Sequence, residues 1–138
     1  MPEVAFEIID EGRPSQVAAR IEGDRVLLTA RSLETALGWE LKPKGLCRGD
    51  VCVPVAGRPG LVSDGQVDLA SFAELLGRPL ALDLEEHAAA LGASARERGE
   101  ALAGGIAPDF TLPDLSGREW TLSGFRGKKV LLVAYASW

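Results

Sequence analysis

One short sequence pattern occurs twice in the first half of the chain and restricts the folds that it can adopt. Ser32–Gly38 (SLETALG) matches Ser71–Gly77 (SFAELLG) at an offset of 39 residues, and a short β-like stretch precedes each copy. In both copies, apolar residues at helical spacing end at a glycine, which is typical of a short amphipathic helix. Two such strand–helix units can share one core. The alternative is two unrelated short helices that each end at glycine.

Residues 1–82 are predicted to form a small α+β domain around this repeat. A helix is expected over Ala30–Leu37, and Leu41–Asp50 is expected to be a loop. The order strand, apolar helix, Ala-Leu-Gly, strand resembles a small domain found at the start of copper amine oxidases and in bacterial cell-surface proteins, a resemblance that carries no catalytic residue. Apolar or β-branched stretches predict strands over Val4–Ile9, Gln16–Ile21, Arg25–Leu28, Val51–Val55 and Gln66–Leu69.

Residues 83–105 are predicted to be a helical connector. Asp83–Ala103 is rich in Ala, Glu and Arg, which favours helix, and Gly104-Gly105 then breaks the pattern. The charge also changes here, since residues 1–105 carry seventeen acids against eleven bases and residues 106–138 carry three acids against four bases. We therefore expect a different structural part after this joint.

Composition and charge narrow the classes of function. The chain has 138 residues, of which 46% are hydrophobic and 25% charged, as in globular proteins. Its net charge of -5 argues against general binding to nucleic acid or to anionic membranes. No apolar run approaches the roughly 20 residues of a membrane-spanning helix. The first residues, Met1–Glu7, lack the features of an export signal, so a cytoplasmic protein is expected.

The two cysteines and the single histidine are the other candidate functional residues of the first part. Cys47 and Cys52 are separated by four residues, a spacing that allows a disulfide across a hairpin and a role as a resolving or regulatory redox pair. The alternative is two free thiols packed under a loop. His87 is expected on the exposed face of a helix. So few Cys and His residues predict no metal site.

Residues 106–138 carry a more specific series of motifs. In order, these are Ala107–Leu112 (APDFTL), Asp114–Gly117 (DLSG), Leu122–Lys128 (LSGFRGK) and an apolar run that ends at Ala136-Ser137-Trp138. The order and spacing of these motifs resemble the opening of the redoxin branch of the thioredoxin-like fold. This branch contains alkyl hydroperoxide reductases and thiol-specific antioxidant proteins, together with thioredoxin-like disulfide reductases.

Each of these motifs also predicts a local structure. Asp109–Leu112 and Glu119–Leu122 are expected to pair as an antiparallel hairpin around the turn at Asp114–Gly117. Ser123 is expected to cap a short helical turn that buries Phe125. Lys129–Ala136 is apolar on both faces, as in a central parallel strand. The predicted fold class is therefore an α+β N-terminal domain followed by the start, a β-hairpin plus central strand, of an α/β thioredoxin-like fold over residues 106–138.

The redoxin resemblance implies reduction of a peroxide or of a disulfide, with no cofactor, by a nucleophilic cysteine directly after the Ala-Ser-Trp motif. Ser137 and Trp138 would then flank the active site, and residues 1–138 would contain no catalytic residue. The expected reductant is a thiol protein or a small thiol. A helix N-terminus at the nucleophile would favour its thiolate form near neutral pH.

Two further expectations concern the end of the sequence. We expect the codon after Trp138 to be UGA, read as selenocysteine, because a selenol suits the same exchange chemistry. A cloning boundary, a frameshift or a gene error are the alternatives. An unpaired Lys129–Ala136 strand is expected to cause self-association. The alternative function is that of a non-catalytic binding or interaction module formed by residues 1–105.

Overall fold

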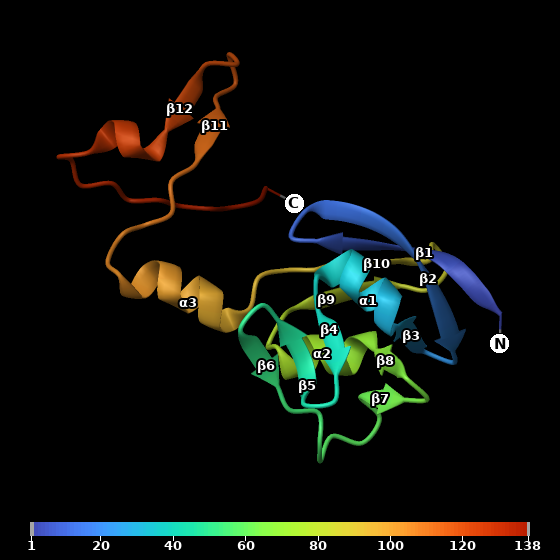
Figure 1. The fold of residues 1–138 in the computed structure, drawn as a ribbon. Helices are drawn as coiled ribbons and strands as arrows, with labels where there is room; N and C mark the ends of the chain where they lie inside the picture. The colour runs from blue at the N-terminus through green and yellow to red at the C-terminus, as the bar shows by residue number, and fades with distance from the viewer. Residues whose placement is uncertain (1, 138) are drawn as a thin grey trace. The chain divides into compact units, whose positions relative to one another are not determined.

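The computed structural model describes residues 2–137 and divides the chain into two units, Met1–Arg98 and Gly99–Trp138 (Figure 1). In the first unit, seven strands form one sheet in the order β7-β8-β3-β2-β1-β10-β9. All neighbours in this sheet are antiparallel except β1 and β10, which are parallel. The strands are β1 (Glu3–Asp10), β2 (Arg13–Glu22), β3 (Arg25–Thr29), β7 (Val62–Ser63), β8 (Gln66–Asp68), β9 (Leu80–Asp83) and β10 (Ala88–Leu91).

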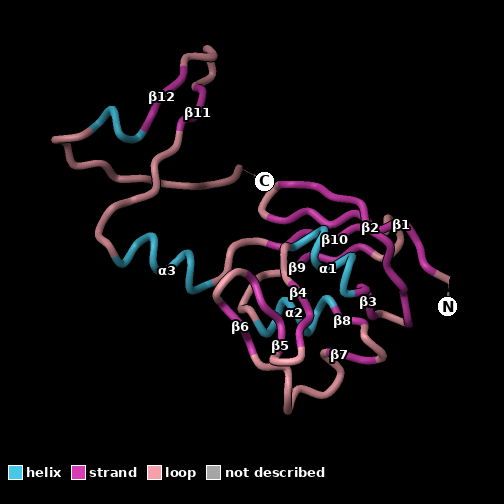
Figure 2. Tube along the Cα trace, viewed as in Figure 1, coloured by secondary structure: helices cyan, strands magenta, loops and turns pink. Residues whose placement is uncertain are grey.

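A smaller sheet and two helices complete the first unit (Figure 2). The helices α1 (Ala30–Leu37) and α2 (Leu69–Leu75) pack on the strands that precede them. The smaller sheet has the order β4-β5-β6, with β4 at Glu40–Lys42, β5 at Gly45–Arg48 and β6 at Val51–Val53. The core lies between these elements. Its fully buried residues include Phe6, Ile8 and Leu28 from the sheet, Leu33 from α1 and Phe72 from α2.

The repeat seen in the sequence forms two neighbouring strand–helix units, β3 with α1 and β8 with α2, related by a local twofold pseudosymmetry. Leu28 of β3 pairs with Val67 of β8, and these two residues are 39 positions apart, so each pairs with its own counterpart. The N-caps of the two helices follow the same offset. The Thr29 hydroxyl accepts from the Ser32 amide at 3.1 Å, and the Asp68 carboxylate accepts from the Ser71 amide at 3.0 Å. The shared core expected of two strand–helix units is present.

Several local predictions for the first unit are confirmed. The strands β1, β2, β3 and β8 lie where the sequence places them, and α1 spans Ala30–Leu37 as expected. Gly38 then ends this helix with a left-handed φ of 71°, and its amide donates to the Glu34 carbonyl. The strand β6 ends at Val53, earlier than predicted, just before Pro54, which has no amide hydrogen to donate to a ladder.

The prediction of a loop over Leu41–Asp50 is wrong, because this segment contains parts of β4 and β5. Leu46 is fully buried and anchors β5 to the core. Gly45, at a φ of 134°, passes so close to β6 that a Cβ there would lie 2.2 Å from the Val53 carbonyl oxygen. The close approach of these two backbones requires glycine at position 45. In the sequence, a glycine after Pro43-Lys44 predicts a loop, which is why the strand was not predicted.

The prediction of helix over Asp83–Leu91 is also wrong, because this segment forms the β9–β10 hairpin. The Asp83 carboxylate accepts from the amides of Glu85 and Glu86 and so closes the turn. Strand β10 then pairs with β1, a neighbour remote in sequence, which outweighs the helix propensity of alanine. His87 is therefore not on a helix, but in the turn at a φ of 50°, with its carbonyl accepting from the Glu7 amide at 2.8 Å.

A later part of the predicted connector is helical. Helix α3 spans Ala95–Ala103 and buries none of its residues. Ser94 and Glu97 form a reciprocal capping box at its start, since the Glu97 carboxylate accepts from the Ser94 amide and the Ser94 hydroxyl accepts from the Glu97 amide. These bonds, led by the backbone bond from Ser94, lower the pKa of Glu97. Among residues 2–137, no helix is long and apolar enough to cross a membrane.

The second unit contains a short hairpin, β11 (Thr111–Pro113) with β12 (Glu119–Thr121), followed by the 3₁₀ helix η1 (Leu122–Phe125). The predicted hairpin is thus confirmed. The predicted central strand over Lys129–Ala136 is not formed, and Leu131 and Tyr135 are 89% and 88% exposed. A central strand needs a hydrogen-bonded neighbour on each side, and the described part of the chain supplies neither.

The pseudosymmetric pair of Leu28 and Val67 makes a testable prediction. Leu28→Ala removes a fully buried side chain and is expected to lower the free energy of unfolding by about 2–5 kcal/mol. The matched variant Leu132→Ala changes a side chain that is 67% exposed and is expected to stay within about 0.5 kcal/mol of the parent. Urea unfolding followed by circular dichroism measures both, and equal effects would contradict this account of the core.

Candidate functional site

The second unit is the first candidate site, because it carries the redoxin-like motifs. Asp114 organises its hairpin: Oδ1 accepts from the amides of Ser116 and Arg118 at 2.9 and 3.0 Å, and Oδ2 accepts from the Trp120 indole at 2.9 Å. The hydroxyl of Ser116 also donates to Oδ1. These bonds, with the Ser116 side chain first, lower the pKa of Asp114 to about 2. The DLSG motif therefore folds around a carboxylate that is ionised at neutral pH.

A second carboxylate joins the hairpin to η1. Asp109 Oδ1 accepts from the Ser123 amide at 2.8 Å, and bonds from Ser123, its side chain first, lower the pKa of Asp109. The capping prediction was therefore wrong in its direction: Ser123 receives the cap, and Asp109 of the APDFTL motif provides it. Phe125 is half-buried and not fully buried as predicted; its ring stacks on Trp120 at 6.0 Å between centroids.

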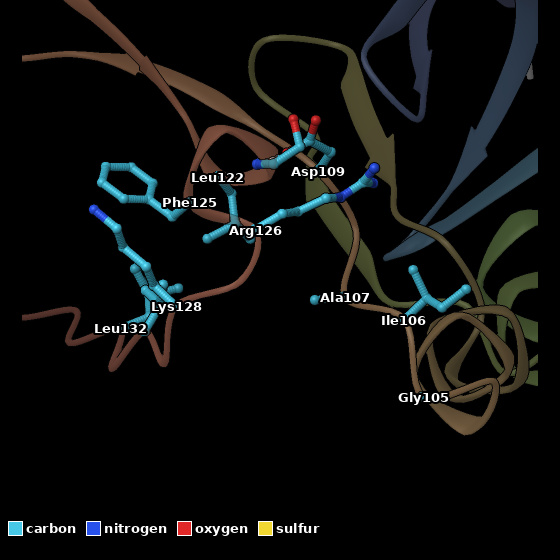
Figure 3. Close-up of a pocket in the computed structure, with 11 residues that line it drawn as sticks. Gly105, Ile106, Ala107, Asp109, Leu122, Phe125, Arg126, Lys128 and Leu132 are labelled. Carbon is cyan, nitrogen blue, oxygen red and sulfur yellow. Dashed lines mark hydrogen bonds between the residues drawn. The ribbon is translucent and has the colours of Figure 1, made fainter.

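An open cleft of about 580 Å³ lies beside these motifs (Figure 3), and Asp109, Arg126 and Lys128 are its charged lining residues. Leu122 and Phe125 from η1 and Leu132 from the following segment line it, with Ile106 from the start of the unit. Both carboxylates of the motifs accept hydrogen bonds from backbone amides, and such bonds favour their ionised forms. Within residues 99–137 the motifs thus position backbone and apolar surface, and no nucleophilic pair is brought together.

The two predicted flanking residues lie at the end of this unit. Ser137 is exposed. Trp138 lies outside the described residues, so its predicted position beside the active site stays a prediction.

Cys47 and Cys52 form the second candidate site, in the first unit. They face each other directly across β5 and β6 and are joined by a disulfide, with their Cα atoms 4.1 Å apart. The alternative of two free thiols is therefore wrong. Cys47 is buried and Cys52 half-buried. Because only four residues separate them, the chain-entropy contribution of the bond is small, about 2 kcal/mol.

Sequence reasoning missed a buried ion pair close to the repeat. Arg78 pairs with Asp10, and its Nε donates to the Gly92 carbonyl at 2.8 Å, so that its side chain is only 6% exposed. Arg78 and Trp39 line a small cavity of about 100 Å³. They lie 39 positions apart, so extending the repeat alignment by one residue beyond its glycines is the signal that could have drawn attention to them.

No metal-binding group stands out in the described chain: within residues 2–137, no three His, Cys, Asp or Glu side chains gather where they could hold an ion. Comparison of the chain with protein-family models, with curated proteins and with solved structures finds no match. The α+β architecture is observed directly, whereas the redoxin resemblance rests on the motif residues alone.

The ionised carboxylate of Asp114 predicts how the hairpin responds to acid. Its pKa in the folded chain lies below the ordinary value of 3.8, so its stabilisation of the hairpin is complete above pH 3.8 and is lost as the pH falls through about 2. The indole N–H resonance of Trp120 should report this with a midpoint near 2. Asp114→Asn should remove the transition and the exposed control Glu119→Gln should keep it; a midpoint at 3.8 contradicts the network.

Proposed function

We propose that residues 106–138 are the opening segment of a redoxin-type domain that reduces peroxides or disulfides. In this proposal the nucleophile, a cysteine or a selenocysteine, occupies the position directly after Trp138. The single observation that carries the proposal is the segment Val130–Ala136, an apolar run that is exposed and unpaired in the described chain. Such a run is what a central strand presents before its neighbouring strands and helices pack on it.

The hairpin and η1 support the same proposal. The APDFTL, DLSG and LSGFRGK motifs fold as one locally bonded unit through Asp109 and Asp114, just ahead of the apolar run. None of the described residues of this unit is buried, and these hydrogen bonds join its parts. It would set the position and direction in which the apolar run enters a sheet, and thereby the position of the residue that follows it.

The chemistry of the proposed site is thiol or selenol exchange. A thiolate or selenolate attacks a peroxide oxygen, releases water or an alcohol, and becomes a sulfenic or selenenic acid. It can instead attack a disulfide sulfur and form a mixed disulfide. A thiol protein or a small thiol restores the nucleophile in either case. A selenol suits both reactions, because it is more acidic than a thiol and a better leaving group.

The test uses the natural gene product, including whatever follows Trp138, produced in a host that decodes UGA as selenocysteine. With dithiothreitol as reductant, this protein is expected to consume hydrogen peroxide or to reduce insulin disulfides. Serine in place of the nucleophile should abolish turnover, whereas the exposed-turn control Asp24→Asn should retain it. A protein with neither cysteine nor selenocysteine after Trp138, or with neither activity, overturns the proposal.

A second candidate function, that of a binding or interaction module, has one observation in its favour. Every buried apolar residue in the described chain lies between Phe6 and Leu91, within the first unit. That unit therefore has its own core and does not depend on residues 106–138 for it.

The solution behaviour of the 138-residue chain distinguishes the two candidates. If the chain acts as a module, it should be monodisperse by size-exclusion chromatography with light scattering, since the unpaired run Val130–Ala136 then causes no self-association. If Val130–Ala136 is a strand without neighbours, the chain should self-associate, and deletion of residues 106–138 should restore a monomer. Self-association that persists after the deletion contradicts the assignment of Val130–Ala136 as the segment that causes it.

A further inference from the structure

We propose that Cys47 and Cys52 are a redox couple that passes electrons to the proposed redoxin nucleophile, with Glu40 as the general base of the couple. The electron acceptor rests on the function proposed above, whereas the exchange chemistry of the pair does not. In this scheme Cys52 is the attacking cysteine and Cys47 the resolving cysteine.

The β5–β6 hairpin does not need the disulfide to keep its two strands in register. Gly49 and Asp50 alone connect β5 to β6, and a two-residue turn already sets the register of a hairpin. The pair Leu46 and Val53 anchors the same two strands on one side, with Leu46 fully buried. A bond that closes so short a loop constrains the unfolded chain little. Breaking it should therefore leave the fold intact, which is a requirement for a bond that is made and broken in each cycle.

The two cysteines differ in their exposure to solvent. Cys52 is half-buried beside Val51, which is 60% exposed, whereas Cys47 is only 2% exposed. Thiol–disulfide exchange requires access of the partner sulfur to the attacking sulfur. An external partner can therefore meet Cys52, and Cys47 can react only from within the hairpin.

An acidic residue is paired with the buried cysteine across the small sheet. Glu40 of β4 lies directly opposite Cys47, and Cys47 lies directly opposite Cys52, so the three residues form one row across the small sheet. Directly paired residues have their side chains on the same face with Cβ atoms about 5 Å apart. Glu40 is exposed and paired with Lys42 at 3.1 Å. This shared row is the basis on which we assign Glu40 as the base that takes the proton of the Cys47 thiol.

In the proposed cycle, the reduced cysteine pair transfers two electrons to the oxidised nucleophile. Cys52 attacks the sulfenic or selenenic acid of the oxidised nucleophile, which gives a mixed disulfide or selenosulfide and water. Glu40 removes the proton of the Cys47 thiol, and the Cys47 thiolate attacks Cys52 Sγ. The nucleophile leaves as thiolate or selenolate, and the Cys47–Cys52 disulfide remains. Two electrons have left the pair, and an external dithiol, itself oxidised to a disulfide, restores them.

The test uses the 138-residue chain and glutathione disulfide, and needs no nucleophile beyond Trp138. Dithiothreitol should reduce Cys47–Cys52 without denaturant, with the circular dichroism spectrum unchanged. The reduced chain should then convert glutathione disulfide to two glutathione molecules. By mass spectrometry, Cys47→Ser should trap glutathione on Cys52, and folded Cys52→Ser should trap none. A disulfide that reduces only in denaturant, or trapping on Cys47 and not on Cys52, overturns the redox couple.

The role of Glu40 has its own measurement. Glu40→Gln should slow the closing step, in which glutathione leaves Cys52, by about a hundredfold, and should leave the first attack by Cys52 unchanged. The matched control Glu34→Gln, an exposed glutamate on α1, should change neither step. Equal closing rates in Glu40→Gln and the parent overturn the assignment of Glu40. If the pair exchanges as expected but the natural protein reduces neither peroxide nor disulfide, only the proposed acceptor fails.

Discussion

The pairing of β3 with β8 is the interaction on which the first unit depends. It joins two strand–helix units, each too small to bury its own apolar face, through the contact of Leu28 with its counterpart Val67. The helices that follow the two strands then start at equivalent caps, Thr29 and Asp68, and lie on the same core. The antiparallel register of β3 and β8 thus sets the positions of the two helices that follow these strands. The remaining strands extend the sheet on both sides of this pair.

The second unit is held by a different kind of interaction. No residue from 99 to 137 is fully buried, so hydrophobic burial contributes little to its local shape. Its hairpin and 3₁₀ helix are organised by two carboxylates, Asp109 and Asp114, that accept hydrogen bonds from backbone amides. Such a unit is well defined over a few residues and leaves its apolar run, Val130–Ala136, without a partner. This contrast gives the two units different functional candidates, a self-contained module and the opening of a redox domain.

Local features of the fold were predictable from the sequence, and features set by remote neighbours were not. Helix α1 and its glycine end, the strands around Gly23 and the DLSG turn follow from propensity and spacing within a few residues. The β9–β10 hairpin could not be predicted in this way, because the alanines of β10 have a high helix propensity and form a strand only through their parallel pairing with β1. Strand β5 did not follow either, since the need for Gly45 becomes visible only when the Val53 backbone lies against it.

The candidate sites divide in the same way. By itself the sequence determined the order of the redoxin-like motifs, the absence of a catalytic cysteine within them and the spacing of Cys47 and Cys52. Only the tertiary structure decided that these two cysteines are bonded, that Glu40 shares their row and that Arg78 is buried against Asp10. The physical reason is that motif order and spacing are properties of neighbouring residues, whereas pairing partners, burial and charge neutralisation depend on strands brought together from distant parts of the chain.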